Sequence, residues 1–164
     1  MITIQPMQLQ QAPVLLDIYR QGIASGMATF ETTVPEWPGF DAKYLPHSRI
    51  VALEEEQITG WAALSPVSPR DCYAGVAEVS VYVAEAQQRK GIGRILLMSL
   101  IKESESNGIW SLLSVIHEEN RASIHLHEQC GFRYIGYRER IAKLDGVWRT
   151  TVMMERRSGK VGVE

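Results

Sequence analysis

The chain has 164 residues, of which 45% are hydrophobic and 22% charged, a balance typical of a globular domain and not of a disordered chain. Its 17 basic and 19 acidic side chains give a net charge of −2, which argues against a broad nucleic-acid-binding surface. No apolar run reaches the about 18 residues of a membrane span, and Met1–Pro6 lacks signal-peptide features, so we expect a cytoplasmic protein without membrane partners.

Periodicity of the apolar residues predicts the secondary structure. In chain order we expect a strand at Ile2–Gln5, a helix at Pro13–Ser25, a brief helix from Asp41, strands at Arg49–Leu53, Ile58–Leu64 and Glu78–Val83, a helix at Gly91–Gly108, a strand at Leu112–Ile116, a helix at Asn120–Cys130, and strands at Phe132–Leu144 and Val147–Arg156. The strand, helix and strand around Gly91 predict a right-handed parallel crossover. We therefore expect one α/β domain over residues 1–157.

Turn signals connect these elements. Trp37-Pro38-Gly39 predicts a loop, and Asp145-Gly146 predicts a tight hairpin turn. Ser65–Gly75 predicts a longer loop of the kind that often carries binding groups. The polar tail Ser158–Glu164 is predicted to be flexible. Two cysteines without Cys-x-x-Cys spacing, Cys72 and Cys130, favour reduced thiols over a disulfide or a metal site.

The stretch Glu78–Arg94 has the clearest functional pattern. Its strand alternates Val79, Val81 and Val83 with polar residues and runs into a basic glycine turn and then a helix. A helix that begins directly after such a turn directs unpaired N–H groups and a positive dipole at one point, which suits a phosphate. The basic side chains of this turn are therefore interpreted as a local anion site.

Three glycine-loop patterns compete for this turn, and a plain basic turn that caps the helix is a fourth possibility. A P-loop needs Lys and then Ser or Thr after its last Gly, but Arg94 and Ile95 follow Gly93. A dinucleotide-binding fingerprint needs a third Gly where Leu96 stands. The sequence Gln88-Arg89-Lys90-Gly91-Ile92-Gly93 instead matches the Q/R-x-x-G-x-G/A pattern of the GNAT family of N-acetyltransferases.

A second stretch strengthens the resemblance to that family. Asn120, Ser123 and His127 stand at i, i+3 and i+7, on one stripe of the last predicted helix. This stripe, followed by Gly131-Phe132, is similar to a GNAT motif, and His in place of the usual Tyr resembles the phosphinothricin acetyltransferase branch. The resemblance covers about residues 2–156. It implies the GNAT fold, a twisted mixed sheet of about seven strands flanked by about four helices.

The resemblance also implies acetyl-coenzyme A as cosubstrate, without a metal. The pyrophosphate would lie over the main chain of Arg89, Lys90, Gly91, Ile92, Gly93 and Arg94. The pantetheine arm would pair with the main chain of Val81, Tyr82 and Val83, and Asn120 and Ser123 would face it from the helix stripe. Asn120 is also interpreted as a simple helix cap.

Two residues are candidates for proton transfer. An amine acceptor is protonated near neutral pH, so a carboxylate beside the cleft, Glu78, is our candidate base. His127 is the candidate acid that protonates the leaving thiolate, although the two roles are open to exchange. The alternatives are a surface carboxylate at Glu78 and a packing histidine at His127.

The acceptor side follows from the resemblance alone. Phe30 is similar in position to a residue that lines the acceptor pocket of that branch, and Arg70 and Tyr73 resemble its substrate loop. They are expected to recognise an anionic group of a small amino-acid-like amine, with an exposed loop Arg and a packing Tyr as the alternative. A protein N-terminus or lysine as acceptor, and an acyl-coenzyme A sensor without turnover, stay open. The resemblance further implies a homodimer.

Overall fold

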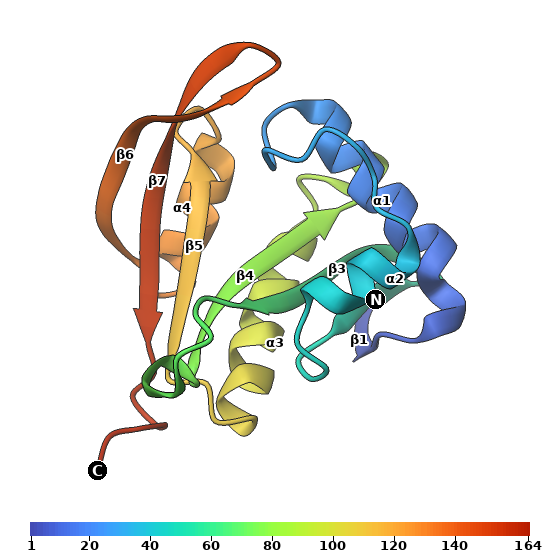
Figure 1. Ribbon diagram of the computed structural model, residues 1–164. Helices are drawn as coiled ribbons and strands as arrows, with labels where there is room; N and C mark the ends of the chain where they lie inside the picture. Colours follow the sequence, from blue (N-terminus) through green and yellow to red (C-terminus); the bar gives the residue numbers. More distant parts are fainter.

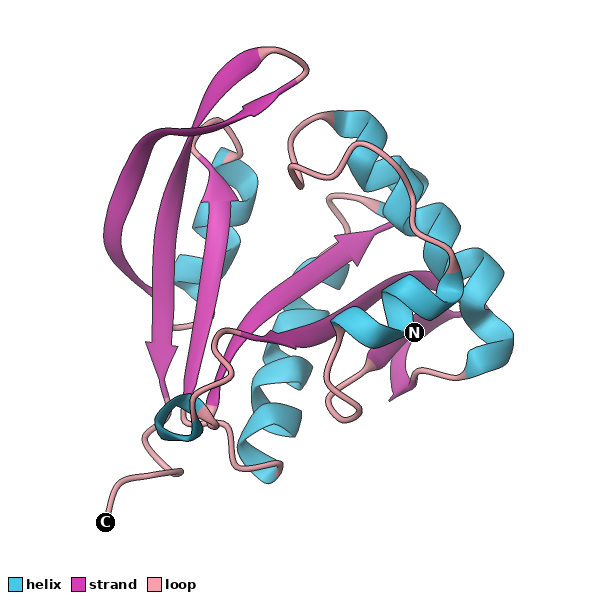
Figure 2. Cartoon of the chain, viewed as in Figure 1, coloured by secondary structure: helices cyan, strands magenta, loops and turns pink.

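The computed structural model describes all residues from Met1 to Glu164. Seven strands form one mixed sheet in the order β1-β2-β3-β4-β5-β7-β6, and four α-helices cover it (Figures 1 and 2). The elements are β1 (Ile2–Pro6), α1 (Ala12–Ser25), α2 (Trp37–Lys43), β2 (Ile50–Glu54), β3 (Gln57–Pro66), β4 (Val76–Val83), α3 (Ile92–Ser106), β5 (Ser111–His117), α4 (Arg121–Gln129), β6 (Arg133–Leu144) and β7 (Val147–Arg157). The predicted fold class is confirmed. None of the helices is long and apolar enough to cross a membrane.

The parallel pair β4 and β5 lies at the centre of the sheet, and every other neighbouring pair is antiparallel. Helix α3 connects the two parallel strands, as the sequence predicts. Figure 1 shows β4 and β5 side by side where they begin and diverging toward their carboxyl ends. The sheet is therefore divided into two parts, β1 to β4 and β5 to β6, which separate at the carboxyl ends of β4 and β5 (Figure 1).

The two faces of the sheet carry different cores. One face packs on α3 and α4 through mainly aliphatic side chains, including Leu96, Leu100 and Met154. The other face packs on α1 and α2 through a cluster of aromatic rings, among them Tyr19, Phe40, Tyr44, Trp61 and Tyr82. Because side chains alternate along a strand, the odd-numbered valines of β4 lie on the aliphatic face and Tyr82 on the aromatic face.

The predicted loop at Trp37-Pro38-Gly39 is wrong, because this segment is the first turn of α2. Pro38 fits there since the first N–H groups of a helix have no intrahelical partner, and its fixed φ suits the helix. The aromatic rings of Trp37 and Phe40 stack at 5.1 Å, which anchors this short helix to the core. The hairpin turn at Asp145-Gly146 is confirmed, with φ values of 49° and 79° that a two-residue turn requires.

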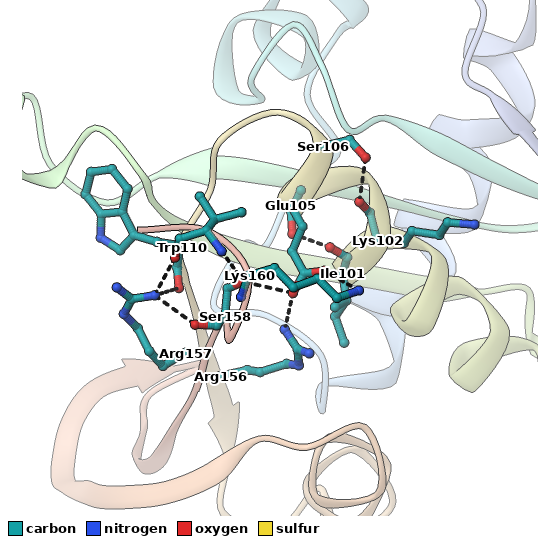
Figure 3. Close-up of polar contacts among 11 residues, drawn as sticks. Ile101, Lys102, Glu105, Ser106, Trp110, Arg156, Arg157, Ser158 and Lys160 are labelled. Carbon is teal, nitrogen blue, oxygen red and sulfur yellow. Dashed lines mark hydrogen bonds and ion pairs between the residues drawn. The ribbon is translucent and has the colours of Figure 1, made fainter. Parts of the chain in front are cut away.

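The segment after β7 lies against the body of the domain (Figure 3). The N–H of Ser158 donates to the carbonyl of Trp110, and its hydroxyl donates to Glu105 on α3 at 3.0 Å. Arg156 and Lys160 form ion pairs with the same carboxylate, at 3.1 and 3.5 Å. The polar composition of the tail predicts flexibility and does not indicate these contacts.

Candidate active site

The main chains of β4 and β5 separate toward their carboxyl ends (Figure 1), and we call this divergence of the two strands the cleft. The two strands pair only from Val76 to Glu78 on β4 and from Ser111 to Leu113 on β5. Beyond these residues β4 continues to Val83 alongside β3, and β5 continues to His117 alongside β7. The carboxyl ends of parallel strands at such a divergence are a common place for ligand binding.

The hydrogen-bond register shows which main-chain groups border this cleft. Ala84 N–H donates to Thr59 of β3, so even-numbered residues of β4 direct their main chain to β3. The N–H and C=O groups of Val79, Val81 and Val83 therefore point toward β5. The N–H of Val79 takes part in the last bridge to Leu113, and beyond it the C=O of Val79 and both groups of Val81 and Val83 have no strand partner. They offer an extended ligand a strand edge to pair with.

This register changes the expectation for Tyr82. Its main chain faces Trp61 of β3, and its buried ring stacks on Trp61 at 4.8 Å. The cofactor-binding prediction for Val81 and Val83 fits the open edge, and Val79 joins them. Tyr82 therefore packs β4 against β3 and does not border the cleft.

The glycine turn presents a row of unpaired donors. Gly91 is the residue before α3 and has φ 80°, and Arg89 also has a positive φ of 63°. None of the main-chain hydrogen bonds outside regular elements has its donor between Arg89 and Arg94, and the first N–H groups of a helix have no intrahelical acceptor. The predicted pyrophosphate site thus has free N–H groups and a helix N-terminus at one place.

The second glycine of this turn allows close packing. A Cβ atom on Gly93 would lie 3.2 Å from a methyl group of Leu126 on α4 and 3.8 Å from Val83. Among the basic side chains, Lys90 donates to Gln87 at 2.7 Å, while Arg89 and Arg94 are exposed and form no ion pair. The buried side chain of Ile92 belongs to the core, so its predicted contribution is its N–H group.

Glu78 lies at the vertex of the cleft, in the last residue pair between β4 and β5. Its half-buried carboxylate has no hydrogen-bond or ion-pair partner. Burial raises the pKa of this carboxyl, and the nearby ammonium of Lys43 opposes the rise. A carboxylate with a raised pKa and a free oxygen is suited to accept a proton near neutral pH.

His127 does not reach the cleft with a free nitrogen. It is 4% exposed and packs edge-on against Phe132 at 5.0 Å. Its Nδ1 lies 2.7 Å from the carbonyl of Ser123, so Nδ1–H donates, and Nε2 accepts from the hydroxyl of Ser114 at 3.0 Å. Burial lowers its pKa, although the Ser123 backbone opposes this. The predicted proton donor is thus a neutral histidine that links α4 to β5.

Asn120 and Ser123 both have local structural contacts. The side chain of Asn120 accepts from Ser123 N–H at 3.2 Å, which caps α4, and its amide donates to the carbonyl of Met27 at 3.1 Å. Ser123 is half-buried, and its hydroxyl lies 3.4 Å from Nδ1 of His127. Their contact with a cofactor stays a prediction.

The structure does not bring together all the predicted acceptor residues. Arg70 and Tyr73 form a cation–π pair with 5.6 Å between guanidinium and ring, and both are exposed in the loop before β4. Neither makes a hydrogen bond or ion pair with Glu78. Phe30, by contrast, lies over the end of β5, with its ring 4.6 Å from that of His117.

Three residues of this region were missed by sequence reasoning: Lys43, His117 and Arg149. Lys43 is the last residue of α2, which the sequence predicts only as a brief helix from Asp41. His117 extends β5 by one residue beyond its predicted end. Arg149 on β7 donates to the carbonyl of Gly26 at 3.2 Å and pairs with Glu119. The only sequence signal for these three residues is the position of His117 directly after an apolar strand.

Comparison with known proteins relates this geometry to characterised enzymes. Residues 17–132 match the model of the acetyltransferase (GNAT) family. The chain is 31% identical to a phosphinothricin N-acetyltransferase of Alcaligenes faecalis, over 94% of this chain and 81% of that protein. It is 28% identical to an L-methionine sulfoximine/L-methionine sulfone acetyltransferase of Pseudomonas aeruginosa, over 87% of each chain.

A solved structure has the same fold. It is a phosphinothricin acetyltransferase of the GNAT superfamily from Sinorhizobium meliloti in complex with AcCoA, and it is 27% identical to this chain. The superposition has a TM-score of 0.90 and covers 99% of this chain and 91% of that one.

Proposed function

This chain belongs to the acetyltransferase (GNAT) family, and we propose that it transfers the acetyl group of acetyl-coenzyme A to the amine of a small amino-acid-like acceptor, such as phosphinothricin or methionine sulfoximine. One observation carries this proposal. The cleft between β4 and β5 has free main-chain donors along one side and at the glycine turn, and a desolvated carboxylate, Glu78, at its vertex. The names of the relatives support the acceptor class.

The cosubstrate fits the donors that the chain presents. The main chain of Arg89 to Arg94 would hold the pyrophosphate, and the edge of β4 at Val79, Val81 and Val83 would pair with the pantetheine arm. An N–H group of this edge would also polarise the thioester carbonyl. Acetyl-coenzyme A supplies an acyl group that is activated as a thioester.

Acetyl transfer then needs a neutral amine. The carboxylate of Glu78 takes a proton from the ammonium group of the acceptor, directly or through one water. The amine nitrogen attacks the thioester carbonyl carbon and forms the new C–N bond, the C–S bond breaks, and one of the two remaining amine protons passes to the leaving thiolate or to water. The leaving thiolate resembles that of cysteine, with a pKa of about 8.5, so its departure does not require an acid. We assign His127 the role of positioning α4 against β5.

The proposal is tested with purified protein in two steps. Isothermal titration with acetyl-coenzyme A measures binding, and release of free thiol measures turnover with a panel of amines. We expect cofactor binding and turnover with phosphinothricin, methionine sulfoximine or a related amino acid. If acetyl-coenzyme A does not bind at millimolar concentration, the proposal is wrong.

The same panel separates the two other functions that the sequence leaves open. Peptides with free N-termini and lysine-containing peptides belong in the panel beside the amino acids. Turnover of peptides alone would identify a protein acetyltransferase. Tight cofactor binding with no acetylated product from any amine would identify a sensor, and in that case Glu78→Gln would leave cofactor binding unchanged.

We further infer a homodimer in the cytoplasm. The hairpin of β6 and β7 exposes a set of large apolar side chains at the edge of the sheet: Tyr134, Ile135, Tyr137, Ile141, Val147 and Trp148. An apolar set of this kind favours contact with a second protein surface. The two unpaired cysteines support a reducing compartment. Sedimentation of a monomer at micromolar concentration would contradict the dimer.

A further inference from the structure

Two buried polar side chains beside the cleft lack hydrogen-bond partners, and the roles assigned above use neither of them. His117 ends β5 and pairs across the sheet with Thr151 of β7; they are 4% and 2% exposed. Neither ring nitrogen of His117 makes a hydrogen bond of good geometry, although the Thr29 backbone lies close to the ring, and the hydroxyl of Thr151 and Nε of Arg149 have no partner. Buried polar atoms in folded proteins are almost always paired. Several orphans in one place point to a group that binds there.

These side chains lie on the same face of the sheet as the candidate base. Glu78 is level with Leu113 on β5, and Leu113, Val115 and His117 alternate onto one face. Val115, which lies between Leu113 and His117, is 37% exposed, so the sheet surface between Glu78 and His117 is open to solvent. The Cα atoms of Leu113 and His117 are separated by about 13 Å, at about 3.3 Å per residue. A small acceptor with its amine at Glu78 can direct its other polar end toward His117.

The segment that covers His117 is weakly held. The ring of Phe30 meets the imidazole edge-on at 4.6 Å and 71°. No hydrogen bond between two main-chain groups has its donor or acceptor in the loop part of this segment, Met27–Pro35. Its start is anchored, because Arg149 and Asn120 donate to the carbonyls of Gly26 and Met27, and Thr29 contacts His117 and Tyr82. Segments with few main-chain bonds open at low free energy. Phe30 can therefore move aside while the start of the segment stays in place.

The unpaired atoms at this place are suited to an oxygen ligand. Burial lowers the pKa of His117, the Thr29 backbone opposes this, and Arg149 lowers the pKa further. A neutral imidazole has one N–H donor, a threonine hydroxyl has one, and Nε of Arg149 has another. The guanidinium adds a positive charge, which Glu119 at 3.3 Å only partly offsets because its side chain is half exposed. Donors of this kind favour an anionic or strongly polar oxygen group.

We propose that His117 and Thr151, together with Nε of Arg149, bind an oxygen-bearing polar group of the acceptor after Phe30 has moved aside. This inference rests on the proposed acetylation of an amino-acid-like amine. The group bound is an acid or oxo group of the acceptor, either its carboxylate or the oxygens on an oxidised sulfur or phosphorus atom. Binding at this place orients the amine toward Glu78.

The test compares three acceptors with the wild-type enzyme and two variants, His117→Phe and Thr151→Val. The acceptors are L-methionine sulfone, its carboxamide, which lacks the carboxylate, and L-methionine, which lacks the sulfone oxygens. We expect each variant to lower kcat/KM for L-methionine sulfone by roughly ten- to a hundredfold, the effect of one lost hydrogen bond to a charged or strongly polar group. The loss disappears with the carboxamide if the carboxylate is bound there, and with L-methionine if the sulfone is.

Stability and cofactor binding provide the readout that a merely structural role would change. Both variants replace unpaired polar atoms with apolar ones, so Tm should stay or rise, and the Kd for acetyl-coenzyme A should not change. The control is His125→Phe, because this histidine side chain is 70% exposed on α4, and it should match the wild type throughout.

Two results overturn the inference in distinguishable ways. If the wild type acetylates L-methionine sulfone and the variants lose the same factor with all three acceptors, or lose Tm, the pair is structural and only this inference fails. If the wild type acetylates no amino acid, the proposed function fails and the acceptor site fails with it.

Discussion

The two halves of the proposed active site would recognise their ligands by different means. The cofactor half consists of the β4 edge at Val79–Val83 and the turn at Arg89–Arg94, and it offers main-chain N–H and C=O groups. The acceptor half consists of Glu78, His117 and Thr151 under the covering segment Met27–Pro35, and it offers side chains. Main-chain donors depend on local backbone geometry. Side-chain donors depend on which distant segments meet.

A buried histidine in each half shows the same difference. His127, on the cofactor side of the sheet, has both ring nitrogens occupied, by Ser123 and Ser114. His117, on the acceptor side, has neither occupied. A satisfied buried polar group stabilises a fold, whereas an unsatisfied one lowers stability and is retained where a ligand needs it. In the proposed site, the cofactor half is therefore complete as folded, and the acceptor half would be completed by its ligand.

Removal of the candidate base should have the largest effect. Glu78→Gln should lower kcat by about 10²–10⁴-fold, the usual contribution of a general base. It should also stabilise the protein at pH 7. The folded-state pKa of Glu78 is raised, so the carboxyl contributes stability that is present below its unfolded pKa and lost as pH rises through the folded value. Steady-state rates and thermal unfolding measure the two effects.

The matched control for this variant is Glu103→Gln, an exposed carboxylate on α3. It should change neither rate nor Tm. A Glu78→Gln enzyme that retains wild-type kcat would assign proton removal to another group and leave the acceptor half without its chemistry.

The next effect sharpens the claim that the cofactor half depends on main-chain geometry. Gly91 has φ 80° with no atom near its missing Cβ, so a side chain there is opposed by backbone strain and not by space. Gly91→Ala should lower affinity for acetyl-coenzyme A about tenfold, because strain of about 1–2 kcal/mol favours a changed turn. Gly91→Asn should lose less, since Asn tolerates this conformation. Titration calorimetry measures both.

Gly108, at the other end of α3, provides the control. It has φ 79° and an equally open environment, but it is remote from the turn. Gly108→Ala should lower Tm without changing cofactor affinity. Equal affinity losses for both alanine variants would mean that the turn acts through helix stability and not through its donors.

Most of the fold was predictable because its signals are local. Alternating valines located β4, the glycine turn located the start of α3, and Asp145-Gly146 located the last hairpin. The error at Trp37-Pro38-Gly39 arose because Pro and Gly usually interrupt helices. Here the stacking of Trp37 on Phe40 and the position of Pro38 in the first turn outweigh that tendency.

The site was predictable only in its local part. The glycine turn and Glu78 lie within one continuous stretch of sequence, and the structure places both at the cleft. The burial of His127, and its contact with Ser114 on another element, depend on tertiary packing that no spacing reveals. His117, Thr151 and Phe30 come from three distant segments, so their meeting had no pattern in the sequence.

The satisfied histidine gives a smaller effect, on stability. His127→Phe leaves the hydroxyl of Ser114 without its partner in the core, so it should lower the free energy of unfolding by about 1–3 kcal/mol at pH 7.5. His117→Phe should not lower the free energy of unfolding.

Wild-type stability should fall below pH 6.5, because the folded-state pKa of His127 is lowered and the unfolded chain takes up the proton more readily. Urea unfolding at several pH values measures this, and His127→Phe should flatten part of the fall. An unchanged stability at pH 7.5 would contradict the satisfied state of His127.

The smallest effect concerns Lys43, whose ammonium lies 5.3 Å from the centre of the Tyr44 ring and lowers the pKa of Glu78 against the rise that burial causes. Replacement by an uncharged side chain of similar length, Lys43→Met, leaves burial as the dominant influence, so the pKa of Glu78 should rise further. The acid limb of kcat/KM, which reports the free enzyme, should then move to higher pH, while Lys43→Arg keeps it in place.

Because Lys43 is exposed, salt should screen its effect on the pKa of Glu78. The wild-type limb should therefore move upward with ionic strength and that of Lys43→Met should not. If both limbs respond equally to salt, Lys43 does not tune Glu78, and the acceptor half sets the pKa of its base by burial alone.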